Sequence, residues 1–170
     1  MYFIARHNSY EHNPGSIVRR CEEAYGFYPY NYYFCMLTAE TAFNNRFDYN
    51  GKELPERIEV LQYWCDKGLT LNPYKRELRT LKRFVLKRES LSSAIKYWEN
   101  YVEWNFWDPD NHAVLVDLYA QAGNFGRAME SLRLAEKSEH YEKVRKKLHT
   151  TWQKEITPPD FINDKEWKEN

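Results

Sequence analysis

Two stretches of sequence decide the fold: LRTLKRFVLKRESLSSAIKYWENY at residues 78–101 and HAVLVDLYAQAGNFGRAMESLRLA at residues 112–135. They begin 34 residues apart, and a shift of that length superimposes most of their apolar and small residues. The apolar residues of each stretch recur every three or four positions, which is typical of two amphipathic helices joined by a short turn. The superimposed pairs are Leu78/His112, Leu81/Leu115, Val85/Tyr119, Leu91/Phe125, Ala94/Ala128, Ile95/Met129, Trp98/Leu132 and Tyr101/Ala135.

A period of 34 residues with two helices per unit resembles the tetratricopeptide repeat, whose pattern is W-x2-L-G-x2-Y…A-x3-F. The second unit has the form H-x2-L-V-x2-Y…A-x3-L from His112 to Leu132, and the first has L-x2-L-K-x2-V…A-x3-W from Leu78 to Trp98. The resemblance covers residues 73–142 and implies a stack of helical hairpins. Both units lack the small residue after the leucine and the closing proline. The small residue of each unit, Ala94 or Ala128, stands where its two helices are expected to cross.

Prolines stand at expected first helical positions, Gly123 is an expected helix stop and residues 46–54 are an expected loop. The expected helix caps are Asn13, Asn72, Ser90, Asp108 and Asn124. No stretch alternates between polar and apolar residues over a strand's length, so an all-α chain of about eight helices is predicted. The helix over 141–156 is expected to cap a single repeat domain spanning 1–156, and residues 157–170 to form a partly ordered polar tail. The expected helices are 14–25, 31–45, 55–69, 73–88, 91–105, 109–122, 125–138 and 141–156.

Composition narrows the class of protein. The 170 residues include 25 Lys and Arg and 25 Asp and Glu, so the formal net charge is zero and a histone-like polycation is excluded. No apolar run reaches the length of a membrane span, and the first residues do not form a signal peptide. The three cysteines, Cys21, Cys35 and Cys65, have no metal-binding spacing and are expected to be buried thiols. These features favour a soluble protein, with a cytoplasmic location as the expectation, although the compartment stays open.

The sequence offers no set of residues for catalysis. The five histidines form no zinc-binding spacing, and no nucleophile elbow or phosphate-binding glycine loop occurs. Asp108, Asp110 and His112 lie close together in sequence, but a helix cap with an acidic first turn explains them better than a metal site. We therefore expect a protein that is not an enzyme and has no cofactor and no metal.

A strongly basic helix is the first candidate binding surface. Seven of the fourteen residues from 75 to 88 are Lys or Arg, and only one is acidic. The tetratricopeptide resemblance implies that Arg76, Arg79, Arg83 and Lys87 line a concave groove, which would select an acidic peptide, a carboxylate or a phosphate. Two other interpretations stay open. The basic face is solvated, or Asp110 and Asp117 of the following repeat neutralise it.

Aromatic residues are the second candidate. The chain has 14 Tyr, 9 Phe and 6 Trp, and much of this content is expected to fill the layers between helices. Phe106 and Trp107 follow a helix in a connecting turn, where an exposed aromatic side chain can anchor a partner. Residues 25–34 are also rich in tyrosine and are expected to line a pocket or to cover a partner domain or a second copy of the chain.

The leading hypothesis from the sequence is a non-catalytic scaffold that binds a peptide or a partner domain. RNA binding is an alternative, because the stretch 115–124 also resembles pentatricopeptide repeats, but Asp110 and Asp117 disfavour nucleic acid. A further alternative is a soluble repeat domain of a larger, membrane-associated or multidomain enzyme.

Overall fold

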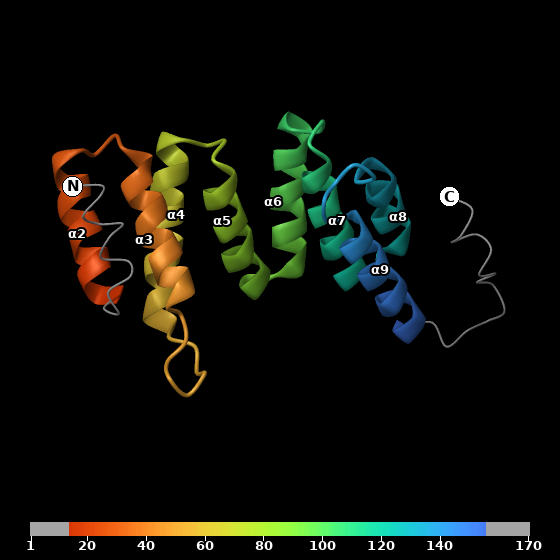
Figure 1. Cartoon of the computed structure of the whole chain (residues 1–170), viewed down its shortest axis with the longest axis horizontal. Helices are drawn as coiled ribbons and strands as arrows, with labels where there is room; N and C mark the ends of the chain where they lie inside the picture. The colour runs from red at the N-terminus through yellow and green to blue at the C-terminus, as the bar shows by residue number, and fades with distance from the viewer. Residues whose placement is uncertain (1–13, 156–170) are drawn as a thin grey trace. The chain divides into compact units, whose positions relative to one another are not determined.

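A computed structural model describes residues 14–155, and this part of the chain folds into eight α-helices (Figure 1). The predicted all-α fold is confirmed. Among the described residues the one β-type pairing is an isolated antiparallel bridge between Phe47 and Glu53. The helices are α2 (Pro14–Phe27), α3 (Tyr32–Asn44), α4 (Pro55–Leu71), α5 (Arg76–Glu89), α6 (Leu91–Trp104), α7 (Pro109–Gln121), α8 (Phe125–Leu134) and α9 (Tyr141–Glu155).

Three of the predicted helix caps form as the sequence indicates. The side chains of Ser90, Asp108 and Asn124 accept hydrogen bonds from backbone N–H groups at the starts of α6, α7 and α8. Gly123, at φ +69°, takes the left-handed conformation that ends a helix. Asn13, the cap expected for the first helix, lies outside the described residues.

Two predicted helix boundaries are wrong. Asn72 does not cap the start of the next helix: its N–H bonds to the Gly68 carbonyl as the end of α4, and its side chain accepts from the Tyr74 N–H in a turn. The helix predicted from residue 73 therefore begins at Arg76. α8 ends at Leu134 rather than at 138. Ala135 begins a turn in which the Ser138 N–H donates to the Ala135 carbonyl.

The chain forms two compact units, divided between Glu89 and Ser90. Unit 1 contains α2 to α5, and unit 2 contains α6 to α9. The division falls inside the first of the two sequence repeats, between its two helices. The tetratricopeptide-like superhelix and the single repeat domain over 1–156 stay predictions, and the expected tail lies outside the described residues.

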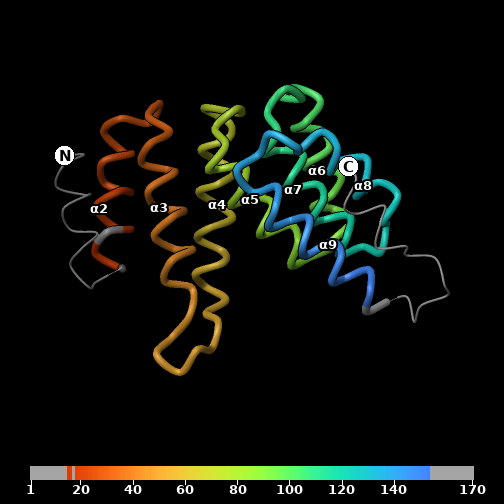
Figure 2. The backbone as a smooth tube through the Cα atoms, turned by 45° about the vertical axis from the view of Figure 1, so that its right-hand side comes forward, coloured from red at the N-terminus to blue at the C-terminus, as the bar shows by residue number. Residues whose placement is uncertain are grey.

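Unit 1 is an up-and-down set of helices in which α3, α4 and α5 share one core (Figures 1 and 2). Cys35 and Ala39 of α3, Cys65 of α4 and Leu78 of α5 have no exposed surface. Gly68 lies at a close approach of these helices, because a Cβ added there would be 2.7 Å from Leu78 Cδ1 and 3.0 Å from Cys35 Cβ. The predicted 46–54 loop joins α3 to α4 through a turn with Gly51 at φ +77°.

Unit 2 is built around α7, which carries eight buried residues and contacts α6, α8 and α9. Trp98 of α6 is fully buried, and its indole N–H donates to the Asn111 carbonyl of α7 at 3.1 Å. Phe125 of α8 stacks on Trp152 of α9 with ring centroids 5.4 Å apart. These contacts hold α6 and α7 together at one side and α8 and α9 at the other.

Burial follows the 34-residue periodicity of the sequence. Of the eight superimposed pairs, six are buried at both members, among them Ala94/Ala128 and Trp98/Leu132. The pairs Leu91/Phe125 and Ile95/Met129 are half-buried. The periodicity thus identified the inward faces of these helices, which any packed helical hairpin requires.

Candidate functional site

Lys75, Lys82 and Arg88 of the basic run form ion pairs within unit 1. Lys75 lies 2.9 Å from Glu77, and Lys82 lies 2.7 Å from Asp66 of α4. Arg88 pairs with Glu53 of the loop between α3 and α4. The hydrogen bond with Glu77 raises the pKa of Lys75. The pairs of Lys82 and Arg88 connect α5 to α4 and to the loop between α3 and α4, whereas the pair of Lys75 is local.

The basic row of α5 consists of Arg76, Arg79, Arg83 and Lys87, spaced three or four residues apart. The Arg79 Nε donates to the Pro73 carbonyl at 2.6 Å, so part of its guanidinium fixes the turn before α5. The three arginines are half-buried and Lys87 is exposed. The structure thus places these residues together on one helix, and their binding of an acidic ligand stays a prediction.

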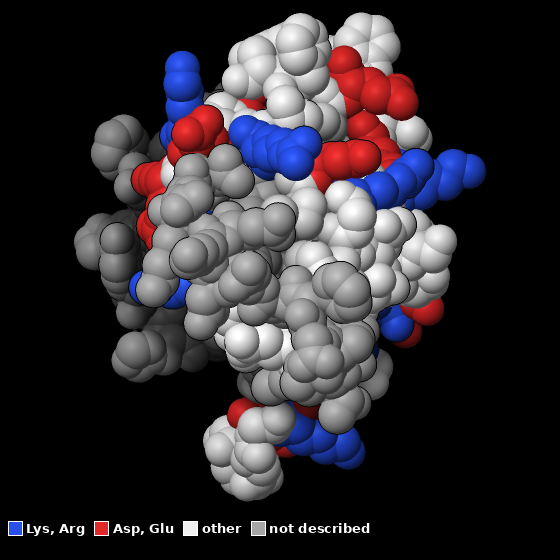
Figure 3. Space-filling view, turned by 90° about the vertical axis from the view of Figure 1, so that its right-hand side faces the viewer, with Lys and Arg blue, Asp and Glu red and all other residues white. Residues whose placement is uncertain are grey.

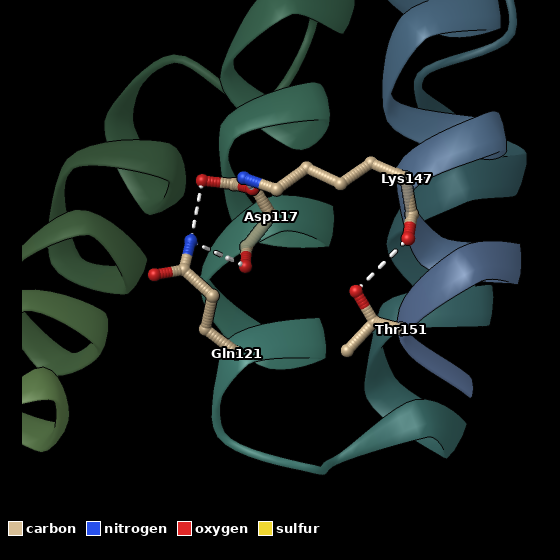
Figure 4. Close-up of polar contacts among 4 residues, drawn as sticks. All are labelled: Asp117, Gln121, Lys147 and Thr151. Carbon is tan, nitrogen blue, oxygen red and sulfur yellow. Dashed lines mark hydrogen bonds and ion pairs between the residues drawn. The ribbon is translucent and has the colours of Figure 1, made fainter. Parts of the chain in front are cut away.

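Asp117 lies in a contact between α7 and α9 (Figure 4). Its carboxylate pairs with Lys147 of α9 and accepts a hydrogen bond from Gln121 Nε2 at 2.6 Å. The Thr151 hydroxyl donates to the Lys147 carbonyl one turn later in α9. Asp117 therefore has a structural role within unit 2, joining two helices that are far apart in sequence.

One cluster of side chains has the spacing of a possible metal site. Ligand atoms of Asp110, Glu139 and His140 all lie within 4.8 Å of one another. Asp110 also accepts a hydrogen bond from the Ser138 hydroxyl at 2.6 Å, so it anchors the loop between α8 and α9. His112 is not part of this cluster, because its Nε2 is 2.7 Å from the Phe106 carbonyl. The sequence did not reveal Glu139 or His140, which are about thirty residues from Asp110.

Large aromatic side chains are exposed at the connection between α6 and α7. Trp104, Phe106 and Trp107 are each between 66% and 69% exposed. The rings of Phe106 and Trp107 meet edge to face with centroids 5.3 Å apart. The structure thus brings together the two aromatic residues that the sequence singled out and adds Trp104 to them.

The tyrosine-rich segment in unit 1 divides into buried and exposed parts. Tyr25 packs edge to face against Trp64 at 5.3 Å, and Phe34 is buried. Phe27, Tyr28 and Tyr30 are between 60% and 88% exposed at the turn between α2 and α3. Part of the segment therefore packs in the core, while its middle presents aromatic rings on the surface of unit 1.

A groove in unit 2, hereafter the α6–α8 groove, was not predicted from the sequence. Its volume is about 520 Å³, and residues of α6, α7 and α8 line it together with Phe106. Its apolar lining includes the buried Val102 and Leu115 and the exposed Phe106 and Leu134. Only Phe106 was a candidate beforehand, because the other residues come from three helices and have no shared sequence motif.

The charged groups in this groove are of two kinds. Glu99 lies 2.7 Å from Arg127 and accepts a hydrogen bond from the Tyr119 hydroxyl. Burial and this bond to Glu99 raise the pKa of Tyr119 to about 12, so its hydroxyl stays protonated and keeps donating. Glu103 and Glu130 are exposed and have no ion pair among residues 14–155. The groove therefore contains one carboxylate that an arginine neutralises and two carboxylates that have no ion pair among the described residues.

The three thiols are free and buried, as predicted. Burial raises the pKa of Cys35 to about 11 and that of Cys65 to about 12. Thiolates are the nucleophilic form of cysteine, so these side chains are unreactive near neutral pH in the folded chain. They act as small apolar core residues.

Comparison with known proteins finds no match for this chain, either among models of protein families or among curated proteins. No helix among the described residues is long and apolar enough to cross a membrane. On the described surface seen in Figure 3, basic and acidic side chains lie next to one another. The candidate sites must therefore be judged on their own geometry.

Proposed function

We propose that this chain is a non-catalytic interaction scaffold in which packed helical hairpins present surfaces to a peptide or a partner domain. The observation that supports this most directly is the position of the exposed aromatic residues. Six of them, all at least 60% exposed, gather at two helix connections, one in each unit. They are Phe27, Tyr28, Tyr30, Trp104, Phe106 and Trp107.

Exposed aromatic rings at such positions are costly unless a partner covers them. Burying one large apolar side chain contributes about 1.5–3 kcal/mol, and the fold forgoes much of this contribution at each exposed ring. Aromatic residues are enriched in the buried centres of protein interfaces, where a few of them provide most of the binding free energy. Clustering makes the two connections stronger candidates than single exposed rings such as Tyr49 in the loop between α3 and α4.

The test compares partner capture by the full chain and by variants of each connection. Phe106→Ser with Trp107→Ser changes the connection in unit 2, and Phe27→Ser with Tyr30→Ser changes the one in unit 1. Tyr49→Ser is the matched control, because this residue is 96% exposed and isolated from both clusters. We expect at least one double variant to lose bound proteins that the control retains. Identical capture by all four proteins would refute the proposal.

The tetratricopeptide-like arrangement is part of the same proposal. It is supported by the 34-residue period of the sequence, and it requires α5 and α6 to form one hairpin. In that hairpin the methyl groups of Val85 would lie near Ala94. Nuclear Overhauser effects between these methyl groups in the full chain would support the repeat, and their absence in a fully assigned spectrum would refute it.

The basic row of α5 is a second candidate surface, for an acidic peptide. Its support is the spacing of Arg76, Arg79, Arg83 and Lys87, which recur every three or four residues along α5. Arg79→Glu with Arg83→Glu should reduce binding of an acidic partner, whereas Lys52→Glu in the exposed loop should not. Retention of RNA in a filter assay at low salt would instead favour the nucleic-acid alternative.

A further inference from the structure

The α6–α8 groove combines three features that the fold of unit 2 does not require. It is hollow, with a volume of about 520 Å³, which lies within the range of about 300–1,000 Å³ found for ligand pockets. Its lining is partly apolar, and two carboxylates at its edge have no partner among the described residues.

The apolar part of the groove continues from the interior to the surface. Val102 and Leu115 are buried, whereas Phe106 and Leu134 are 66% and 61% exposed. Leu134 is the last residue of α8, and its side chain is the one exposed large aliphatic side chain among the described residues. An apolar side chain inserted into the groove would cover both exposed residues and would lie on Val102 and Leu115.

The charged residues of the groove favour a positively charged ligand. Of the three glutamates that line it, Glu99 is neutralised by Arg127. Glu103 and Glu130 remain, so three acidic groups and one basic group leave a formal charge of −2 at the groove. A lysine or arginine beside the inserted apolar side chain would form ion pairs with these carboxylates.

This surface is different from the concave face that the tetratricopeptide resemblance implies. Around the axis of α7, His112, Leu115 and Tyr119 line the groove and lie about 140–200° from Asp110. Asp110 and Asp117 lie on the other side of the helix and contact Ser138 and Lys147. The groove also has the opposite charge from the basic row of α5.

We propose that the α6–α8 groove binds a peptide segment of a partner protein in which large apolar side chains alternate with lysine or arginine. This inference rests on the proposed scaffold function and names the chemistry of one partner. Charge disfavours the chain's own residues 156–170 as the occupant. They include four acidic and two basic residues and would place like charges beside Glu103 and Glu130.

The experiment measures fluorescence anisotropy of a labelled probe titrated with the full chain. The probe is a synthetic peptide of about twelve residues in which leucine or tryptophan alternates with pairs of lysine. A second peptide with glutamate in place of each lysine is the charge control. We expect saturable binding of the basic peptide and at least tenfold weaker binding of the acidic one.

Three variants assign the binding to the groove. Glu103→Lys with Glu130→Lys should weaken binding of the basic peptide by about tenfold, because two attractive contacts become repulsive. Glu59→Lys with Glu136→Lys makes the same change in net charge at exposed positions outside the groove and should leave the affinity unchanged. Leu134→Ser should weaken binding of both peptides. Circular dichroism confirms that each variant is folded.

Peptide binding tests the groove, whereas partner capture tests the proposed scaffold function, so the two can fail independently. Equal binding of both peptides, or equal affinities of the two charge variants, would overturn the inference. The scaffold proposal would still stand if Phe106→Ser with Trp107→Ser abolishes partner capture. A synthetic peptide of residues 1–13, which contains Tyr2, Phe3, Ile4 and Arg6, serves as competitor. Its displacement of the probe at lower concentration than unlabelled probe would assign the groove to this chain and overturn the assignment to a partner.

Discussion

Replacing Gly68 by alanine tests how closely the helices of unit 1 approach one another. In an isolated helix the change would be favourable by about 1 kcal/mol, because glycine is a poor helix former. Here the added Cβ would lie 2.7 Å from Leu78 Cδ1 and 3.0 Å from Cys35 Cβ. The Leu78 side chain is fully buried and the Cys35 Cβ is attached directly to the backbone of α3, so neither neighbour moves away freely.

Overpacking of a well-packed core costs about 1–3 kcal/mol. Set against the helix preference of about 1 kcal/mol, this cost predicts that Gly68→Ala lowers the free energy of unfolding by about 1 kcal/mol. Gly126→Ala is the matched control, because Gly126 is also helical but a Cβ there would have no atom within 4 Å. The control should raise the free energy of unfolding by about 0.5 kcal/mol.

Urea unfolding followed by circular dichroism measures both changes. Hydrogen exchange read by mass spectrometry should show faster exchange in α3 to α5 for Gly68→Ala alone. A double-mutant cycle adds Leu78→Ala, which by itself should cost about 2–5 kcal/mol. The Gly68→Ala methyl group fills part of that cavity, so the double variant should be about 1 kcal/mol more stable than the sum of the single changes. Stabilisation by Gly68→Ala, or strict additivity, would refute the close approach of these helices.

Three further predictions concern the core and the charged contacts. Lys147→Ala should lower the free energy of unfolding by about 0.5–1 kcal/mol at low salt and by less at high salt, because its partly exposed pair with Asp117 is screened; a salt-independent effect in urea unfolding would contradict this. Trp98→Phe should cost about 2–3 kcal/mol in thermal unfolding, since it removes the buried hydrogen bond to Asn111 and leaves a small cavity, whereas Trp107→Phe at an exposed site should be neutral. Burial in the folded chain raises the thiol pKa values of Cys35 and Cys65 from 9.0 to about 11 and 12. The unfolded chain therefore loses these protons at a lower pH than the folded chain, and the free energy of unfolding should fall as the pH rises from about 9 to 12. A chain with both cysteines replaced by alanine should lose less stability between pH 8 and pH 10 in urea unfolding, and an equal loss would contradict the assignment.

Local signals in the sequence were sufficient for most of the fold. All eight helices were located from prolines, caps and the Gly123 stop, and the caps at Ser90, Asp108 and Asn124 were identified correctly. The two wrong boundaries have local causes that compete with those signals. Asn72 serves as well at the end of one helix as at the start of the next, and Ala135 is a good helix former that nevertheless begins a turn.

The candidate sites were predictable only in part. Phe106 and Trp107 were recognised because a connecting turn leaves aromatic side chains exposed. The Asp117–Lys147 pair and the cluster of Asp110 with Glu139 and His140 were not, because their members are about thirty residues apart. The residues of the α6–α8 groove have no common spacing, so no motif could identify them.

The sequence by itself determined where the helices lie, which of their faces are apolar and most of the residues that begin and end them, because these properties depend on neighbours within a few positions along the chain. Only the tertiary structure decided that the chain divides after Glu89, that Asp117 pairs with α9 and that Glu103, Glu130 and Leu134 meet at one groove. Those outcomes depend on the rotation of each packed helix about its axis and on the distance between helices. Both are set by side-chain packing across the unit, which no local pattern of residues specifies.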